Sequence, residues 1–187
     1  MLNYNSVIKN KIKQESISVK EISPVIKINL RGKKREFLTN VGKNLNMILP
    51  TEANTSTTSD KLTAIWLSPD EWMIISNELA SKDTNKSDLY EMLFNSISKT
   101  NLGAVIDVTD QFVQLELKGE NVYEIFSAGS PFNFNEFKEK KGSTTQTVLN
   151  HVDVILHHKD ENILNLFVRR SFAEHLFSWI EDCASRL

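Results

Sequence analysis

The stretch FVQLELKG, residues 112–119, indicates the fold of this chain. Its apolar residues alternate with polar ones, as in a strand with one buried and one solvated face, and the alternation stops at Lys118-Gly119, where a turn is expected. We expect a further strand over 104–108, before this stretch, and a short helix over 120–128, after it. Gly129 would end that helix.

The stretch VIKINLRG, residues 25–32, repeats this pattern about 87 residues earlier in the chain. It also stops at a basic residue followed by glycine, and it precedes a second short helix, predicted over 33–41 and ended by Gly42. A short strand or sheet edge is expected over 45–49. The repeated strand, turn and helix suggest that the chain contains two copies of one unit.

Later segments extend the duplication. Strands over 62–67 and 72–76 flank the turn Ser68-Pro69-Asp70-Glu71, which predicts a hairpin, and a second hairpin is expected around Lys159-Asp160-Glu161. The helical stretches EMLFNSI (91–97) and EHLFSWI (174–180) are identical at four of seven positions. Each unit therefore contains strand, helix, strand, strand, strand and helix in that order, which predicts an α+β fold with mostly antiparallel sheet.

Three segments are predicted along the chain. We expect a basic flexible arm over 1–22, a first α+β unit over 23–100 and a second over 101–187, with the two units packed as one compact domain. The polar stretch 51–60 is expected to be a surface loop without a core-forming residue. A candidate helix N-cap lies at Ser87 or Asp88.

The net charge of −2 hides an asymmetry. Residues 1–36 contain nine bases and three acids, so this stretch carries +6 and the remainder −8. The overall balance disfavours a domain that binds nucleic acid, and no run of 18 apolar residues predicts a membrane span. One cysteine and a lysine-rich, Asn- and Ile-rich composition favour a cytoplasmic protein from a bacterium.

The usual catalytic and metal-binding patterns are missing from the sequence. The four histidines are not spaced as metal ligands; the adjacent His157 and His158 would point to opposite faces of a strand, so we expect no metal site. We expect Cys183 to pack as a small apolar residue rather than to react. No phosphate-binding glycine loop and no serine elbow occurs, so the sequence indicates no catalytic residue and no cofactor within this chain.

Two groups of polar residues remain as candidates. Asp107 and Thr109, in the DVTD stretch 107–110, can bond to the local backbone of a turn. Arg169 and Arg170 precede Ser171, the expected N-cap of the last helix, and two arginines at such a place suit a carboxylate, a phosphate or a partner chain.

The chain resembles the gamma subunit family of heterotetrameric sarcosine oxidase. The resemblance runs from about Ala64 to the C-terminus, in the order WLSPDEW (66–72), DVTD (107–110), GSPFNF (129–134), QTVL (146–149) and RRSFA (169–173), followed by Leu176 and Trp179. It implies a non-catalytic subunit of a complex that demethylates sarcosine to glycine oxidatively, with tetrahydrofolate as one-carbon acceptor and peroxide as by-product.

Partners follow from this resemblance. It implies alpha, beta and delta subunits, with docking chiefly on alpha, and it assigns FAD, FMN, NAD and tetrahydrofolate to the partner subunits. The complex is an oxidoreductase of the bacterial cytoplasm.

The segment GAVIDVT (103–109) is similar, more distantly, to the folate-binding aminomethyltransferase of the glycine cleavage system. That similarity implies the transferase's folate-binding fold, built from repeated α+β units. The Gly-Gly and paired acids that the transferase uses near folate are replaced here by LNHVDV (149–154), in which Asp153 alone aligns with an acid.

The alternative hypothesis is a stand-alone folate-binding or aminomethyl-transfer protein. Arg169 or Arg170 would then hold the glutamate carboxylate of folate, and Trp72 or Phe134 would stack on the pterin ring. A basic-armed RNA-binding domain is a third reading, which the absence of interleaved aromatic and basic residues disfavours.

Overall fold

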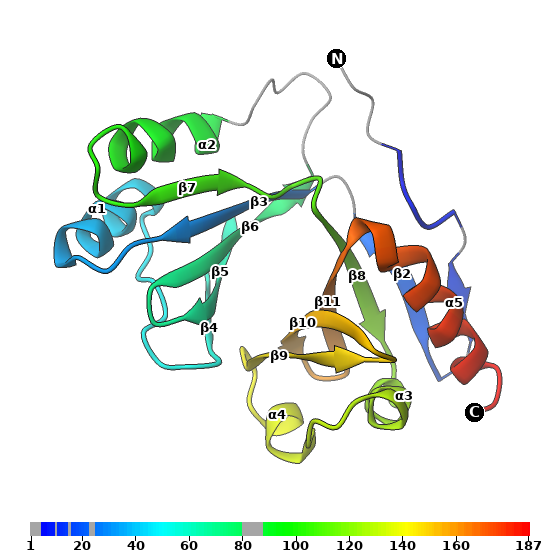
Figure 1. Cartoon of the computed structure of the whole chain (residues 1–187). Coiled ribbons are helices and arrows are strands. Elements are labelled where there is room, and N and C mark those ends of the chain that lie inside the picture. Colours follow the sequence, from blue (N-terminus) through cyan, green and yellow to red (C-terminus); the bar gives the residue numbers. More distant parts are fainter. Residues whose placement is uncertain (1–4, 10, 15, 23–24, 80–87) are drawn as a thin grey trace. The chain divides into compact units, whose positions relative to one another are not determined.

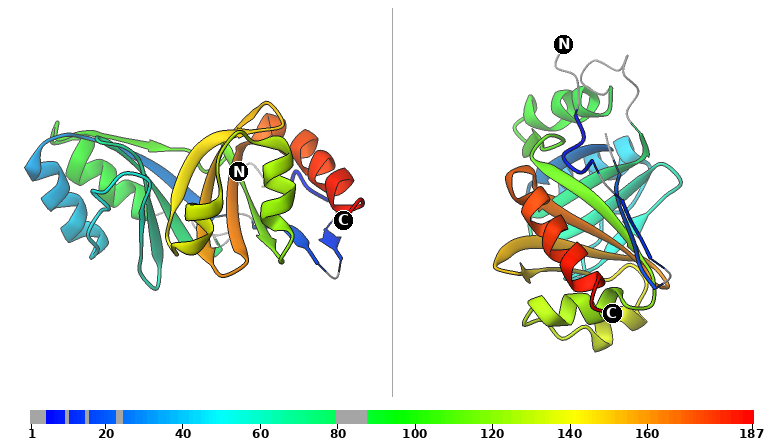
Figure 2. Two further views of the ribbon diagram at one scale, coloured as in Figure 1. Left: turned by 90° about the horizontal axis from the view of Figure 1, so that it is seen from below. Right: turned by 90° about the vertical axis from the view of Figure 1, so that its right-hand side faces the viewer.

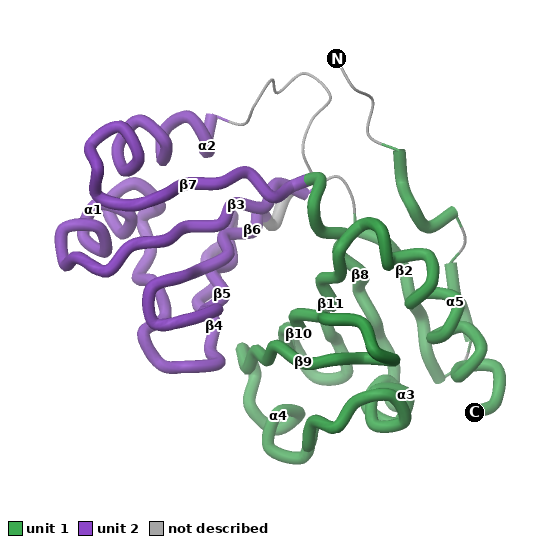
Figure 3. Tube along the Cα trace, viewed as in Figure 1, with its two compact units in different colours: residues 1–23, 110–187 green, residues 24–109 purple. Residues whose placement is uncertain are grey.

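The computed structural model describes residues 5–9, 11–14, 16–22, 25–79 and 88–187. The chain divides into two compact units (Figures 1 and 3). Unit 1 combines Met1–Ser23 with Asp110–Leu187, and unit 2 is the continuous segment Pro24–Thr109. The unit boundaries therefore differ from the expected 23–100 and 101–187, and unit 1 is built from two separate stretches of the chain.

Unit 2 contains one antiparallel sheet of five strands in the order β4-β5-β6-β3-β7. The strands are β3 (Val25–Arg31), β4 (Ser56–Thr58), β5 (Leu62–Ser68), β6 (Glu71–Leu79) and β7 (Ala104–Asp107). The helix α1 (Arg35–Leu45), and α2 (Asp88–Leu93) with the π-helical turn η1 (Phe94–Ser98), contribute apolar side chains to one core with this sheet. Phe37, Leu93 and Ile97 are fully buried there.

Unit 1 contains a sheet of six strands in the order β1-β2-β8-β11-β10-β9, again antiparallel throughout. Its strands are β1 (Ile12–Lys13), β2 (Ser18–Ile22), β8 (Phe112–Lys118), β9 (Thr144–Leu149), β10 (Val152–Asp160) and β11 (Ile163–Arg169). The helices are α3 (Val122–Gly129), α4 (Asn135–Glu139), the 3-10 turn η2 (Arg170–Phe172) and α5 (Ala173–Ala184). Figure 2 shows α5 lying along this sheet, and Leu176 and Ile180 of α5 are buried in the core of the unit.

The predicted α+β class and the duplication are confirmed by this topology. The order β7-β3-β6-β5-β4 in unit 2 matches β2-β8-β11-β10-β9 in unit 1. The registers agree as well, because Arg31 pairs with Ala104 just as Lys118 pairs with Ser18. Each sheet therefore contains one of the two alternating stretches, 25–31 or 112–118, as an interior strand.

One feature of the topology was not expected from the sequence. β2 precedes β3 in the chain but pairs with β8, and β7 precedes β8 but pairs with β3. β3 is thus flanked by β7, the strand that leads into β8, and β8 is flanked by β2, the strand that leads into β3. The two copies exchange their leading strands.

The prediction of a flexible arm over 1–22 is wrong for the described residues. β1 and β2 lie in the sheet of unit 1, and Ile8, Ile12, Ile17 and Val19 are buried in its core. Burial of these apolar side chains repays the entropy of ordering the segment.

Several element ends also differ from the predictions. Gly42 does not end α1, which continues to Leu45 and is closed by Asn46 in the left-handed conformation at φ 49°. Residues 45–49 form no strand, and the polar stretch 51–60 contains the edge strand β4. The short helix α4 was not predicted.

Of the two predicted helix caps, the one at Ser171 is wrong. Ser171 lies inside η2, and the N-cap position of α5 belongs to Phe172, without a side-chain hydrogen bond. Ser87 lies outside the described residues. Among the described residues, no helix is long and apolar enough to cross a membrane.

Candidate functional site

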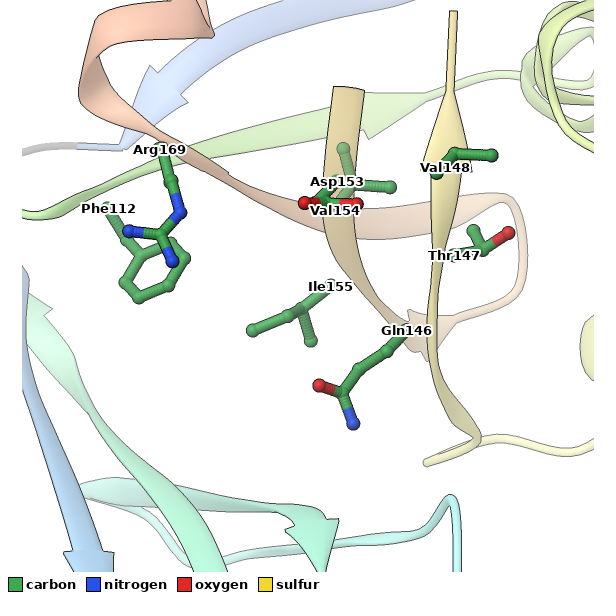
Figure 4. A pocket seen from close by; sticks show the side chains of 8 residues that line it. All are labelled: Phe112, Gln146, Thr147, Val148, Asp153, Val154, Ile155 and Arg169. Carbon is green, nitrogen blue, oxygen red and sulfur yellow. The ribbon is translucent and has the colours of Figure 1, made fainter. Parts of the chain in front are cut away.

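A surface pocket of about 420 Å³ lies on unit 1 and contains the predicted site residue Arg169 (Figure 4). It is lined by strands β8, β9, β10 and β11, through Phe112, Gln146, Thr147, Val148, Asp153, Val154, Ile155 and Arg169. Asp153, which aligns with an acid of the aminomethyltransferase, therefore lies in the same pocket as Arg169, although 16 positions separate the two residues in the sequence.

Strand pairing places these side chains. Arg169 at the end of β11 pairs with Phe112 at the start of β8, and Asp153 on β10 pairs with Val148 on β9. Their strand neighbours Val168, Val113 and Leu149 are in the core. Because successive side chains of a strand point to opposite faces, the pocket lies on the sheet face away from that core.

The side chains that line the pocket include groups that can bind a ligand. The exposed Arg169 guanidinium makes no ion pair or hydrogen bond with the part of the chain that the structure describes, and it lies beside the Phe112 ring (Figure 4). A guanidinium next to an aromatic face suits a planar anion such as a carboxylate. Asp153 is the acidic counterpart on the adjacent strand β10.

Arg170 has a different role from Arg169. Its backbone N–H donates to the carbonyl of Gln111 at 2.9 Å, and its guanidinium donates to the backbone carbonyl of Asn5. Arg170 therefore anchors the N-terminal segment of unit 1.

Trp72 lies in unit 2, whereas both arginines lie in unit 1. Its side chain is only 2% exposed, and its indole N–H donates to the carbonyl of Pro50 at 2.7 Å. Its ring packs against Phe37 at a centroid distance of 5.9 Å. Trp72 also lines a second pocket of about 320 Å³, with Trp66 and Leu38 among its neighbours. Phe134, the other proposed stacking residue, is buried in the core of unit 1.

Two of the four histidines, His157 and His158, are buried, whereas His151 and His175 are exposed. His157 and His158 are each 3% exposed. Burial lowers the pKa of His157 to about 4, and the neighbouring charges of His158 and Lys159 act in the same direction. His158 makes a hydrogen bond through Nδ1 to the Lys140 carbonyl at 3.0 Å. Within the described ranges, no group of three His, Cys, Asp or Glu side chains could hold a metal ion.

The other polar candidates are explained by local packing. The Asp107 carboxylate accepts a hydrogen bond from the Thr109 N–H at 2.9 Å, and the Thr109 hydroxyl oxygen accepts one from the Lys27 N–H at 3.0 Å. The Asp107–Thr109 bond is the predicted local turn bonding, whereas the Lys27–Thr109 bond joins β3 to the residues that follow β7. Cys183 packs against the core of unit 1, where burial, together with the nearby Asp182, raises the pKa of its thiol.

Glu116 lies in a cluster of charges that the sequence alone did not predict. Glu116, at a polar position of the alternating stretch, is 6% exposed, and its carboxylate lies within 3.0 Å of Lys20, 3.1 Å of Lys159 and 3.6 Å of Lys118. Alternation predicts a solvated face at Glu116. The signal that could have located the cluster is the pairing of the lysine-rich segment 18–22 with β8, which sequence spacing does not reveal.

Comparison with known proteins identifies a family, and the solved structures with a similar fold include the two described next. The model of the sarcosine oxidase gamma subunit family matches residues 32–186. No curated protein matches the chain. A chain of the heterotetrameric sarcosine oxidase from Corynebacterium sp. U-96, in complex with pyrrole 2-carboxylate, superposes with a TM-score of 0.82 at 20% identity, covering 94% of this chain and 88% of that one.

The second solved structure is the glycine cleavage system aminomethyltransferase T from Bartonella henselae. It superposes with a TM-score of 0.64 at 17% identity and covers 88% of this chain. The match spans 45% of the transferase. At such identities the similarity concerns the fold, and the aminomethyltransferase-like architecture expected from the sequence is confirmed.

Proposed function

The chain belongs to the sarcosine oxidase gamma subunit family, and we propose that it is the accessory, non-catalytic subunit of a heterotetrameric sarcosine oxidase. The complex would convert sarcosine, tetrahydrofolate and O₂ into glycine, methylenetetrahydrofolate and H₂O₂. The observation that carries this proposal is the family match over 32–186, supported by a fold shared with a chain of a heterotetrameric sarcosine oxidase.

The roles of the titratable side chains support an accessory subunit. His157 is buried with a pKa of about 4, and Arg170 and Glu116 stabilise the fold. The thiol of Cys183 has a raised pKa, which disfavours the reactive thiolate. Following the family match, we assign FAD, FMN, NAD and tetrahydrofolate to the alpha, beta and delta partners.

The proposed docking partner is chiefly the alpha subunit, in the bacterial cytoplasm. Arg169 is the site residue best placed for a contact, because its guanidinium is exposed in the pocket on unit 1. A carboxylate of the partner would fit beside it.

Co-expression with the three other subunits tests this proposal. We expect one particle of fixed stoichiometry on a sizing column, with sarcosine oxidase activity, and a loss of particle stability when the gene for this chain is omitted. An active complex from which this chain elutes separately would contradict the proposal.

The second candidate is folate binding by the chain itself, which the aminomethyltransferase-like fold and the Arg169 pocket favour. In that case Arg169 would hold the glutamate carboxylate of folate. Calorimetric titration with tetrahydrofolate decides between the two: heat that disappears in Arg169→Ala supports folate binding, and no heat at millimolar ligand rejects it.

A further inference from the structure

Three lysines from three strands of unit 1 converge on one carboxylate. The ammonium groups of Lys20 on β2, Lys159 on β10 and Lys118 on β8 lie 3.0, 3.1 and 3.6 Å from the Glu116 carboxylate. The Glu116 side chain is 7% exposed, whereas the lysine side chains are 46%, 52% and 48% exposed. The carboxylate therefore lies beneath three ammonium groups that face solvent.

Two more lysines extend this charge along the same face of the sheet. Ile12 and Val19 are paired and buried in the core, so Lys13 and Ser18, the next pair, stand on the opposite face with Lys20. Lys11 lies next to Ile12, just before β1, and both Lys11 and Lys13 are exposed. We call Lys11, Lys13, Lys20, Lys118 and Lys159 the lysine surface. Five lysines and one glutamate leave a net charge of +4 on a chain whose net charge is −2.

The arrangement exceeds what the stability of unit 1 needs. One carboxylate neutralises one ammonium, and like charges held close together repel one another. Lysines at a sheet edge protect against aggregation, which would account for Lys13 on the edge strand β1 and for Lys11 just before it. Protection of the sheet edge does not account for Lys118 and Lys159, because their strands β8 and β10 lie inside the sheet.

We propose that the lysine surface docks an acidic segment of a partner subunit. Its charge is complementary to a run of Asp or Glu side chains, and Glu116 already holds three of its ammonium groups in place, which reduces the entropy lost on binding. The net charge of −2 on the whole chain disfavours a nucleic acid as the occupant. The identity of the partner rests on the proposed function.

The experiment uses the full chain and two triple variants that lose the same charge. Lys11→Gln/Lys13→Gln/Lys118→Gln removes part of the lysine surface but keeps the two shorter ion pairs of Glu116. Lys43→Gln/Lys61→Gln/Lys138→Gln removes three exposed lysines elsewhere. Each protein is titrated with labelled hexaglutamate, followed by fluorescence anisotropy, and is tested for association with the other sarcosine oxidase subunits at low and high salt.

We expect the surface variant to bind hexaglutamate and the other subunits roughly tenfold more weakly than wild type at low salt, at about twofold per lysine, whereas the control variant should change by less than about twofold. Equal affinities for hexaglutamate in the two variants would overturn the proposal. Tighter binding of an oligothymidylate than of hexaglutamate would overturn it too. If the wild-type chain fails to join the other subunits, the proposed function fails, and the hexaglutamate titration still decides whether the lysine surface binds acidic peptides.

Discussion

The Glu116 carboxylate stays charged although it is nearly buried. Burial alone would raise its pKa, but the hydrogen bonds and positive charges of Lys20 and Lys159 outweigh that effect and leave the pKa below the ordinary value of a glutamate. The charged form is therefore more favourable in the folded protein than in the unfolded chain. This difference makes the stability of unit 1 depend on pH.

Replacing Glu116 by Gln should lower the free energy of unfolding by about 1–2 kcal/mol at neutral pH, because three ammonium groups lose their common partner. A pKa lowered by folding stabilises the protein above the pKa of the unfolded glutamate, and this contribution disappears as the pH falls through the folded pKa. Urea unfolding at about pH 7 and about pH 3 measures it. A difference between wild type and Glu116→Gln that persists unchanged in acid would contradict this account.

Trp72 supplies a second residue-scale test. Its indole N–H donates to the Pro50 carbonyl inside unit 2, so Trp72→Phe leaves a buried carbonyl without its donor. We expect a loss of about 1–2 kcal/mol in thermal or urea unfolding. The control Trp66→Phe changes a partly buried ring and should cost less. An unaltered unfolding midpoint in Trp72→Phe would mean that the indole does not support the fold.

Two glycines at the element scale should respond to alanine with opposite signs. Gly42 lies inside α1 and an added Cβ would meet nothing closer than the Met47 carbonyl at 3.4 Å, so Gly42→Ala should stabilise by about 0.5–1 kcal/mol. Gly119 directly follows β8 with φ 138°, and an added Cβ would collide with the Ser16 carbonyl. Gly119→Ala should therefore lower the free energy of unfolding by about 1–3 kcal/mol. Urea unfolding of both variants checks the pair, and the same sign for both would refute it.

The sequence predicts elements best where local periodicity defines them. The strands 25–31 and 112–118 and the hairpin at Pro69-Asp70 were located from alternation and turn chemistry. The end of α1 was misplaced because Asn46, like glycine, can adopt a left-handed conformation, which allowed the helix to continue past Gly42.

Pairing between distant segments was harder to predict. β1 and β2 are short, and β2 pairs with β8, whose partner residues lie 92 to 100 positions further along the chain, so the segment 1–22 looked like a solvated arm. The Arg169 pocket was found only in part for the same reason. Arg169 stood out as one of two adjacent arginines, but Phe112 and Asp153 join it only through sheet register.

At the scale of the whole molecule, the exchange of leading strands makes the two units unequal. Unit 2 is one continuous segment that contains all five strands of its sheet. Unit 1 obtains β1 and β2 from the N-terminus, with Ile8, Ile12, Ile17 and Val19 in its core. The chain therefore completes unit 1 with residues that precede all of unit 2.

This inequality predicts how fragments of the chain behave. Residues 24–109 should fold alone with a cooperative thermal transition. Residues 110–187 should not, because burial of the four N-terminal apolar side chains contributes about 6–12 kcal/mol, which is comparable to the about 5–15 kcal/mol that stabilise a typical domain. Adding a peptide of residues 1–23 should restore the fold, as followed by circular dichroism and by the fluorescence of Trp179.

A peptide with Ile17→Ser and Val19→Ser serves as the control and should fail to restore it, since both side chains are at most 1% exposed in the intact protein. If 110–187 folded without any peptide, β2 would not be needed to complete the sheet. If the control peptide worked as well as the native one, the apolar face of β2 would not be what holds the two segments together.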